Sequence, residues 1–129
     1  MLARSDRSRS WEIYEAALLS DVADIQGGTT REGIHLGAMA GSVDLIHRAY
    51  TGLELRDDIL WIDPRLPAPM RQLDVIVRYR GHMLEIRVTR DAVEIRASRS
   101  RLPAMKIAVR GEVHELPAGQ QRSFALRRH

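Results

Sequence analysis

The sequence predicts an α+β chain in which helices come first and a small antiparallel β-sandwich follows. Apolar residues recur at helical spacing up to about residue 51, and from about residue 72 they alternate with polar residues as they do in strands. The 129 residues, 44% of them hydrophobic, are enough for one ordinary domain or for a small domain and part of another. We therefore predict helices over 1–52, a linker over 53–71 and a sandwich over 72–129.

A first helix is predicted from about residue 10 to residue 25. Ser10 is a suitable N-cap, because its hydroxyl can accept a hydrogen bond from the first helical N–H groups. The Gly27-Gly28 pair ends the element. Its apolar residues fall on one stripe: Trp11, Tyr14, Leu18, Val22 and Ile25.

A second helix, which Thr29 or Thr30 can cap and which runs to about residue 51, is lined by glycine. Gly33, Gly37 and Gly41 share one face and leave a groove for another backbone. Glycine costs about 1 kcal/mol relative to alanine inside a helix, so packing or a site must compensate. The opposite side is also apolar, with Leu36, Met39, Val43 and Ile46. We expect such a helix to lie inside a larger protein, and to drive self-association of the isolated chain.

The segment 53–69 reads as an irregular connection, because Pro64, Pro67 and Pro69 interrupt it. We interpret the Asp57-Asp58 pair in it as turn or capping residues rather than as catalytic acids. Trp61 is expected to be a buried wedge between domains rather than a ligand platform.

Beyond residue 72 the apolar residues recur with a period of two, which predicts five or six short strands. Turns are expected at Gly81-His82, at Gly111 and at Ala118-Gly119. The outward positions carry both signs of charge, as cross-strand ion pairs on a solvated face would. The predicted strands cover 73–79, 84–89, 93–95 and 105–109, the surroundings of Val113, and 124–126.

Composition excludes several classes of function. All but one of the 20 cationic residues are arginine, but they are scattered among 17 acids and form no basic stripe, which argues against nucleic-acid binding. The chain has no cysteine, so it has neither disulfides nor thiolate metal sites. No apolar run has the length of a membrane span, and no signal peptide is visible at the N-terminus. We therefore expect a cytoplasmic protein without a membrane partner.

The segment 27–35 contains the elements of an anion site. It combines glycine amides, the hydroxyls of Thr29 and Thr30, a helix N-terminus and His35. The residues alone leave open an ordinary capped helix with a core histidine. The five histidines lack the spacing of metal ligands, and no nucleophile elbow, Walker loop or dinucleotide fingerprint is present.

The stretch 20–46 resembles the C-terminal part of glycoside hydrolase family 65, the inverting phosphorylases of trehalose, maltose and kojibiose. Its most specific part is Glu32-Gly33-Ile34-His35 with the following Leu36-Gly37-Ala38-Met39-Ala40-Gly41. The similarity continues through Tyr50-Thr51-Gly52-Leu53-Glu54, through Leu60-Trp61-Ile62-Asp63-Pro64-Arg65-Leu66-Pro67 and through Val77-Arg78-Tyr79-Arg80-Gly81-His82.

The resemblance implies that residues 1–52 are the terminal helices of an (α/α)6 barrel and that a β-sandwich follows them. It also implies that His35 binds phosphate, with Thr29 and Thr30 as weaker candidates. The family's general-acid glutamate and a pair of phosphate-binding serines match nothing in this chain. We therefore expect a C-terminal fragment that is inactive alone. For the full-length enzyme, the resemblance implies a disaccharide and inorganic phosphate as substrates, no cofactor, and a homodimer.

Two alternatives remain open. In a hydrolase of the acid-trehalase type, water would replace phosphate, although His35 favours phosphorolysis. In the second alternative the chain is a non-catalytic β-sandwich interaction module. Exposed aromatic residues are typical of sandwiches that bind carbohydrate, and this chain offers only Tyr79, Phe124 and Trp61. The disaccharide that is cleaved is not determined by these residues.

Overall fold

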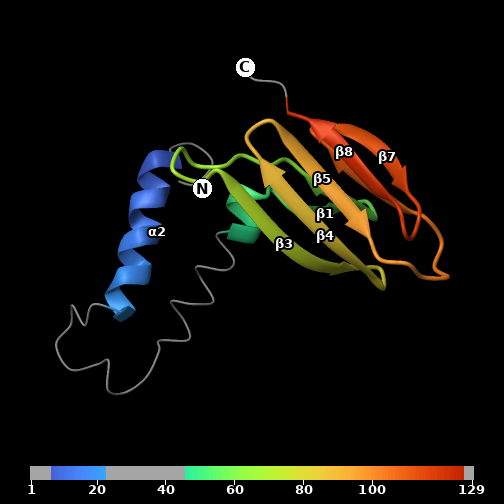
Figure 1. The fold of residues 1–129 in the computed structure, drawn as a ribbon, viewed down its shortest axis with the longest axis horizontal. Coiled ribbons are helices and arrows are strands. Elements are labelled where there is room, and N and C mark those ends of the chain that lie inside the picture. Colours follow the sequence, from blue (N-terminus) through green and yellow to red (C-terminus); the bar gives the residue numbers. More distant parts are fainter. Residues whose placement is uncertain (1–6, 23–45, 127–129) are drawn as a thin grey trace.

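The computed structural model describes residues 7–22 and 46–126, which form a two-sheet β-sandwich with a helix beside it (Figure 1). The helical elements are the α-helix α2 (Arg7–Val22) and the short π-helix η2 (Ile46–Tyr50). The strands are β1 (Glu54–Arg56), β2 (Ile59–Ile62), β3 (Gln72–Tyr79), β4 (His82–Thr89), β5 (Ala92–Ala97), β6 (Met105–Val109), β7 (Glu112–Leu116) and β8 (Gln121–Ala125).

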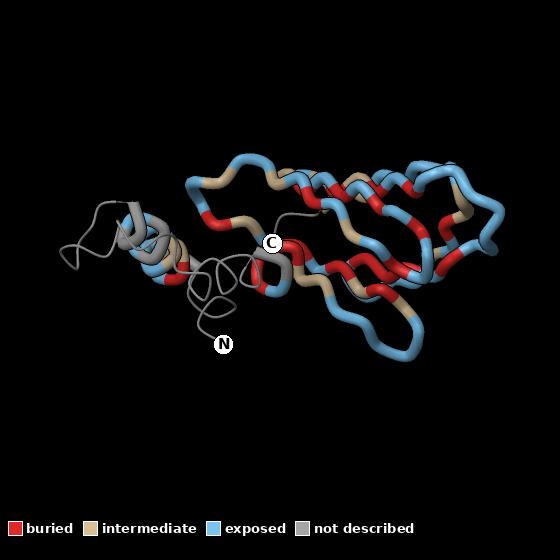
Figure 2. The backbone as a smooth tube through the Cα atoms, turned by 90° about the horizontal axis from the view of Figure 1, so that it is seen from below, coloured by how far each residue is buried: buried red, intermediate tan, exposed pale blue. Residues whose placement is uncertain are grey.

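The strands form two four-stranded sheets. Sheet A has the order β1-β2-β6-β7, and sheet B has the order β3-β4-β5-β8. Neighbouring strands are antiparallel, as predicted, except that β2 and β6 are parallel. The buried residues gather between the two layers (Figure 2).

The core is formed by strands in which buried and exposed residues alternate strictly. In β4, His82, Leu84, Ile86 and Val88 are buried while the residues between them are exposed. Sheet A contributes side chains to the same core, such as that of Ile107, which is fully buried. Full burial of one such aliphatic side chain contributes roughly 1.5–3 kcal/mol, so the aliphatic core predicted from composition is enough to hold the sheets together.

The strands predicted from residue 72 onward are confirmed, with shifts of one to three residues at their ends. The first turn lies at Arg80 and Gly81, whose φ angles of 50° and 83° are left-handed. His82 is therefore the first residue of β4 rather than part of the turn. It is 2% exposed, and its Nε2 lies 3.1 Å from the carbonyl oxygen of Pro103, to which it donates.

The prediction of an irregular connection over 53–69 is wrong in its secondary structure. β1 and β2 lie in this segment and complete sheet A, with Leu60 and Ile62 in the sandwich core. The turn between them contains Asp57 and Asp58, both with left-handed φ, so their interpretation as turn residues is confirmed. The hydroxyl of Tyr79 in sheet B donates to the carbonyl oxygen of Asp58 over 2.6 Å, which ties this turn to the other sheet.

The predicted first helix is present and is described over Arg7–Val22, so that it includes residues before Ser10. The N-cap prediction for Ser10 is wrong, because Ser10 lies inside the helix. Its hydroxyl is buried and lies 3.2 Å from the hydroxyl of Tyr50. The rings of Trp11 and Tyr14 are each centred 6.4 Å from the Tyr50 ring, so the aromatic part of the predicted stripe packs on the end of η2.

Most of the predicted glycine-rich helix lies outside the described residues. Its last part is η2, and the helical conformation ends at Tyr50, close to the predicted end. The described ranges contain one α-helix and this π-helical turn and no barrel. The assignment of the helices to an (α/α)6 barrel, and the domain division built on it, therefore stay predictions.

Candidate functional site

The three residues predicted to bind phosphate, Thr29, Thr30 and His35, lie outside the described residues. Their assignment as a phosphate site stays a prediction.

Within residues 7–22 and 46–126, no group of three or more potential ligands is arranged to hold a metal ion. The two histidines with described side chains in the strands have packing roles. His82 is buried under Pro103, and the ring of His114 lies with its centroid 4.7 Å from that of Phe124. In the same ranges no helix is long and apolar enough to cross a membrane.

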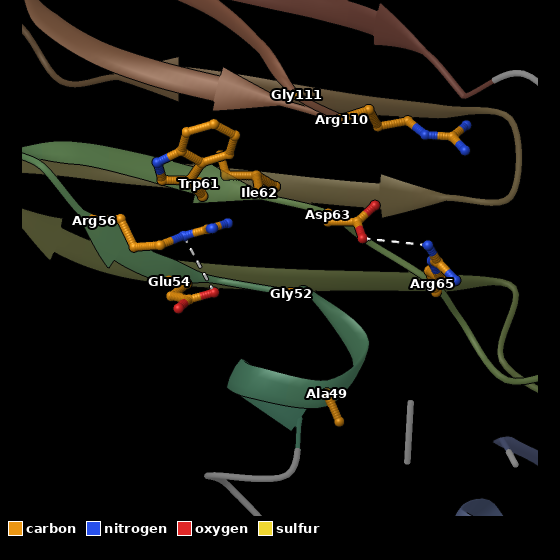
Figure 3. Close-up of a pocket in the computed structure, with 10 residues that line it drawn as sticks. All are labelled: Ala49, Gly52, Glu54, Arg56, Trp61, Ile62, Asp63, Arg65, Arg110 and Gly111. Carbon is orange, nitrogen blue, oxygen red and sulfur yellow. Dashed lines mark hydrogen bonds and ion pairs between the residues drawn. The ribbon is translucent and has the colours of Figure 1, made fainter. Parts of the chain in front are cut away.

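A groove of about 480 Å³ opens at sheet A beside the end of η2 (Figure 3). Its volume lies within the range of about 300–1,000 Å³ that is typical of small-molecule sites. It is built by the end of η2, by β1 and β2 with the segment after β2, and by the turn between β6 and β7. The lining residues are Ala49, Gly52, Glu54, Arg56, Trp61, Ile62, Asp63, Arg65, Arg110 and Gly111.

Trp61 faces this groove because of the alternation along β2. Leu60 and Ile62 point into the sandwich core, so Trp61 points out of it. In the strand register Trp61 lies opposite Glu54 on one side and opposite Ala108 on the other. Ala108 also lies outside the core cluster, yet it is fully buried. Trp61 is thus a partly buried residue of the outer face rather than a fully buried one.

Arg56 lies over the indole of Trp61, with its Cζ 4.4 Å from the ring centroid. Its Nε is also 3.5 Å from a carboxylate oxygen of Glu54. A second ion pair, between Arg65 and Asp63 at 3.5 Å, lies further along the groove (Figure 3). All four charged side chains are about half exposed, so each ion pair contributes about 0–1 kcal/mol. The exposed cation–π contact contributes about 0.5–1 kcal/mol. These side chains can therefore rearrange around a ligand at small cost.

The indole N–H of Trp61 is buried, and the described residues offer it no hydrogen-bond acceptor. Buried donors of tryptophan usually have a partner, so an unpaired one requires an explanation. A ligand of the groove that carries an acceptor oxygen would supply that partner.

The end of the groove near η2 is fixed by backbone contacts. The N–H of Arg65 donates to the carbonyl oxygen of Tyr50 over 2.9 Å. Gly52 has a φ of 63°, and a Cβ at this position would collide with the carbonyl oxygen of Asp63. Because the two backbones approach so closely, Asp63 is held at a fixed place in the groove.

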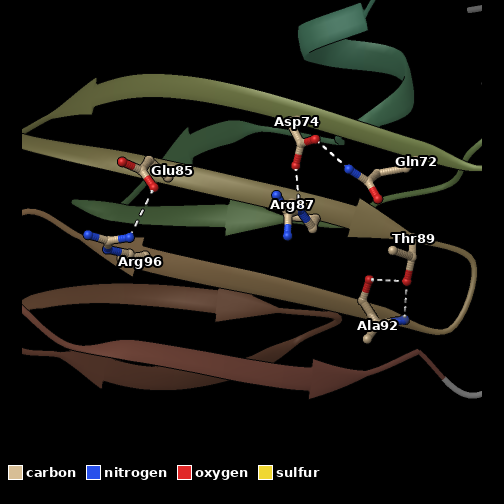
Figure 4. Close-up of polar contacts among 7 residues, drawn as sticks. All are labelled: Gln72, Asp74, Glu85, Arg87, Thr89, Ala92 and Arg96. Atoms are coloured by element: carbon tan, nitrogen blue, oxygen red, sulfur yellow. Dashed lines mark hydrogen bonds and ion pairs between the residues drawn. The ribbon is translucent and has the colours of Figure 1, made fainter.

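The outer face of sheet B carries the cross-strand ion pairs that the sequence predicted (Figure 4). Arg87 donates to Asp74 over 2.7 Å, and Arg96 lies 3.7 Å from Glu85. The hydrogen bond from Arg87, and then that from Gln72, lower the pKa of the Asp74 carboxyl. These charges satisfy one another on a solvated surface, and we assign them a structural role.

The groove at Trp61 was missed by sequence reasoning, although one signal pointed to it. The alternation of Leu60, Trp61 and Ile62 places the tryptophan on the face opposite the two aliphatic residues as soon as the segment is read as a strand. The partners of Trp61 in β1 and β6 follow only from the strand pairing.

Comparison with known proteins identifies the sandwich. The model of the glycosyl hydrolase family 65 C-terminal domain matches residues 53–116. An uncharacterized glycosyl hydrolase of Mycobacterium tuberculosis is 44% identical over 119 residues, which are 92% of this chain and 9% of that protein. A trehalose 6-phosphate phosphorylase of Lactococcus lactis subsp. lactis is 35% identical over 122 residues, which are 95% of this chain and 15% of that protein.

A solved structure from the human microbiome, assigned as a kojibiose phosphorylase, has the same fold. The match has a TM-score of 0.79 at 23% identity and covers 92% of this chain and 17% of that chain. The chain thus spans less than a fifth of the length of these relatives. The family match begins at residue 53, so it includes β1 and β2. The chain belongs to glycosyl hydrolase family 65, and residues 53–116 are the C-terminal domain of that family.

Proposed function

We propose that this chain is the C-terminal part of an inverting disaccharide phosphorylase, which cleaves an α-glucosidic disaccharide such as trehalose, maltose or kojibiose with inorganic phosphate. The observation that carries the proposal is the 35% identity to a trehalose 6-phosphate phosphorylase over 95% of the chain. The sandwich fold, shared with the structure assigned as a kojibiose phosphorylase, supports it.

In this proposal the chain supplies one side of the phosphate site. The imidazole of His35 donates a hydrogen bond to a phosphate oxygen, and the hydroxyls of Thr29 and Thr30 assist. Phosphate attacks the anomeric carbon with inversion, while a general acid protonates the leaving oxygen. That acid matches no residue of this chain, so the chain alone is inactive. The reaction needs no cofactor, because phosphate is itself the nucleophile.

The remaining parts of the proposal concern the whole enzyme. It binds the disaccharide and phosphate in the complete barrel, acts in the cytoplasm and forms a homodimer. The sequence prediction of an apolar, glycine-rich helix up to about residue 51 supports a buried position within the barrel.

A hydrolase of the acid-trehalase type is the second candidate, since the Mycobacterium tuberculosis relative is described as a glycosyl hydrolase. The two candidates differ in whether phosphate is consumed. The deciding experiment uses a chimera. In it, this chain replaces the matching 122 residues of the Lactococcus lactis phosphorylase. We expect the chimera to cleave its disaccharide only when phosphate is present, and the 129-residue chain alone to release no sugar phosphate.

Two results would contradict the proposal. Cleavage by the chimera at the same rate without phosphate would show a hydrolase. Sugar-phosphate release by the isolated chain would show that it holds a complete active site.

A further inference from the structure

We propose that the groove around Trp61 is a non-catalytic saccharide site, which takes a neutral gluco-oligosaccharide. The proposal goes beyond phosphorolysis, because it concerns the groove between sheet A and the end of η2. It does not depend on His35 or on the general acid.

Trp61 provides the groove with an aromatic platform. It is held on the outer face of sheet A by the core packing of Leu60 and Ile62, and its ring is part of the groove lining (Figure 3). The face of an indole carries negative partial charge. The axial C–H groups of a glucopyranose ring form a flat surface of positive partial charge, so a glucose unit stacks well on such a face.

A polar rim lies on both sides of this platform. Glu54 with Arg56, and Asp63 with Arg65, place a carboxylate next to a guanidinium at each position. A carboxylate accepts from a sugar hydroxyl, and a guanidinium donates to the neighbouring hydroxyl oxygen. Two adjacent hydroxyls of glucose match such a pair, and hydrogen bonds to charged groups are the stronger ones.

The groove is lined by the guanidiniums of Arg56, Arg65 and Arg110 and by the carboxylates of Glu54 and Asp63, and its two ion pairs favour a neutral ligand. Each of Arg56 and Arg65 is paired with a carboxylate, so a phosphate or carboxylate ligand would meet negative charge next to each of these cations. A polyol does not meet this obstacle.

The unpaired indole N–H also points to a ligand with acceptor oxygens. It is a buried donor without an acceptor, and the guanidinium of Arg56 lies over its ring. Arg56 is half exposed and joined to Glu54 by an exposed ion pair, so it can move aside. A sugar unit that replaces Arg56 stacks on the ring face, and the N–H, which lies in the ring plane, would donate to a hydroxyl oxygen of a neighbouring unit beyond the ring edge.

The test is a fluorescence titration of the full 129-residue chain with maltoheptaose. Trp11→Phe is introduced in all proteins, so that Trp61 is the single tryptophan and reports directly on its own environment. We expect saturable quenching, and a loss of affinity of about tenfold in Asp63→Asn, which removes the charge of one rim carboxylate but leaves the core unchanged. Ile76→Ala is the matched control, since Ile76 is 65% exposed on sheet B, and it should bind as the parent does.

A second measurement does not depend on tryptophan emission. Isothermal titration of the Trp61→Ala chain with maltoheptaose should give no heat of binding, while the Ile76→Ala chain binds normally. Circular dichroism of each variant confirms that it is folded, and Asp63→Asn replaces Trp61→Ala if the latter unfolds. The proposal is overturned if the parent chain does not bind maltoheptaose, if both groove variants bind as the parent does, or if inorganic phosphate quenches Trp61 while maltoheptaose does not.

Discussion

At the scale of single residues, Gly52 is the glycine within the described ranges at which an added Cβ would come closest to another atom. It combines a left-handed φ of 63° with the carbonyl oxygen of Asp63 where a Cβ would lie. A strained non-glycine backbone of this kind costs about 1–3 kcal/mol, and the collision adds to this cost. We predict that Gly52→Ala lowers the free energy of unfolding by about 2 kcal/mol or more, measured by urea denaturation.

Gly111 is the matched control for this substitution. Its φ of 91° is also left-handed, but a methyl group at this position would meet no atom within 4 Å. Gly111→Ala therefore keeps the backbone strain and omits the collision, so its loss of stability should be smaller. An equal or larger loss in Gly111→Ala would contradict the close approach of Gly52 to Asp63.

The pair of Asp74 and Arg87 predicts a dependence of stability on pH. The hydrogen bond from Arg87 lowers the pKa of Asp74 in the folded chain, so the folded state favours the carboxylate. A lowered pKa stabilises the fold above the ordinary carboxyl pKa of 3.8, and this contribution is lost as the pH falls through the folded value. Asp74→Asn should therefore be less stable than the parent at neutral pH, and the difference should close in strong acid.

Urea midpoints at neutral pH and at about pH 2 measure this effect. The pair is exposed, so the difference at neutral pH should be small and should shrink in high salt. A difference that persists unchanged in acid would show that the asparagine acts through packing rather than through the lost charge.

At the scale of elements, local pattern predicted the strands that pair with their neighbours in sequence. β3, β4 and β5 alternate over six to eight residues and are joined by tight turns, so their period could be read directly. β1 and β2 have only three and four residues, which is too short for an alternation of apolar and polar residues to be recognised. A proline-rich stretch follows them and also suggested a loop. The partner of β2 is β6, a parallel strand distant in sequence, and no local signal specifies such a pairing.

Contacts between residues distant in sequence also explain why the predictions for Ser10 and His82 were wrong. Ser10 has the residue type and position of an N-cap, but contact with Tyr50, distant in sequence, places its hydroxyl inside the structure. His82 follows a glycine and looked like a turn residue, but the carbonyl of Pro103 gives its ring a buried partner. In both cases tertiary packing overrode the local preference. The predicted phosphate residues Thr29, Thr30 and His35 lie outside the described ranges, so this part of the candidate site stays a prediction.

The inclusion of β1 and β2 in sheet A predicts where the sandwich can be shortened. A chain of residues 46–129 retains them, whereas a chain of residues 72–129 loses Leu60 and Ile62 from the core and exposes the edge of β6. Burial of these two side chains contributes about 3 kcal/mol or more, so the shorter chain should lack a cooperative thermal transition. Circular dichroism melting tests this, and equal melting of both chains would mean that β1 and β2 are dispensable.

At the scale of the whole molecule, the chain combines a described sandwich with a predicted glycine-rich helix. The sandwich has its own core of residues from both sheets. The sequence predicts that the glycine-rich helix is apolar on nearly every side, and the relatives are more than five times longer than the part that this chain matches. This contrast supports the proposal that the chain contributes one side of a phosphate site to a barrel rather than a whole active site.

The central claim is that His35 binds phosphate in that barrel. Its most direct test is the steady-state kinetics of the Lactococcus lactis chimera with His35→Ala, measured with phosphate and disaccharide varied separately. A hydrogen bond to a charged group contributes about 1.5–3 kcal/mol, so we predict that kcat/KM for phosphate falls by about tenfold to hundredfold while the KM for the disaccharide stays unchanged. The claim would be contradicted by an unchanged kcat/KM for phosphate, or by a variant in which only the KM for the disaccharide changes.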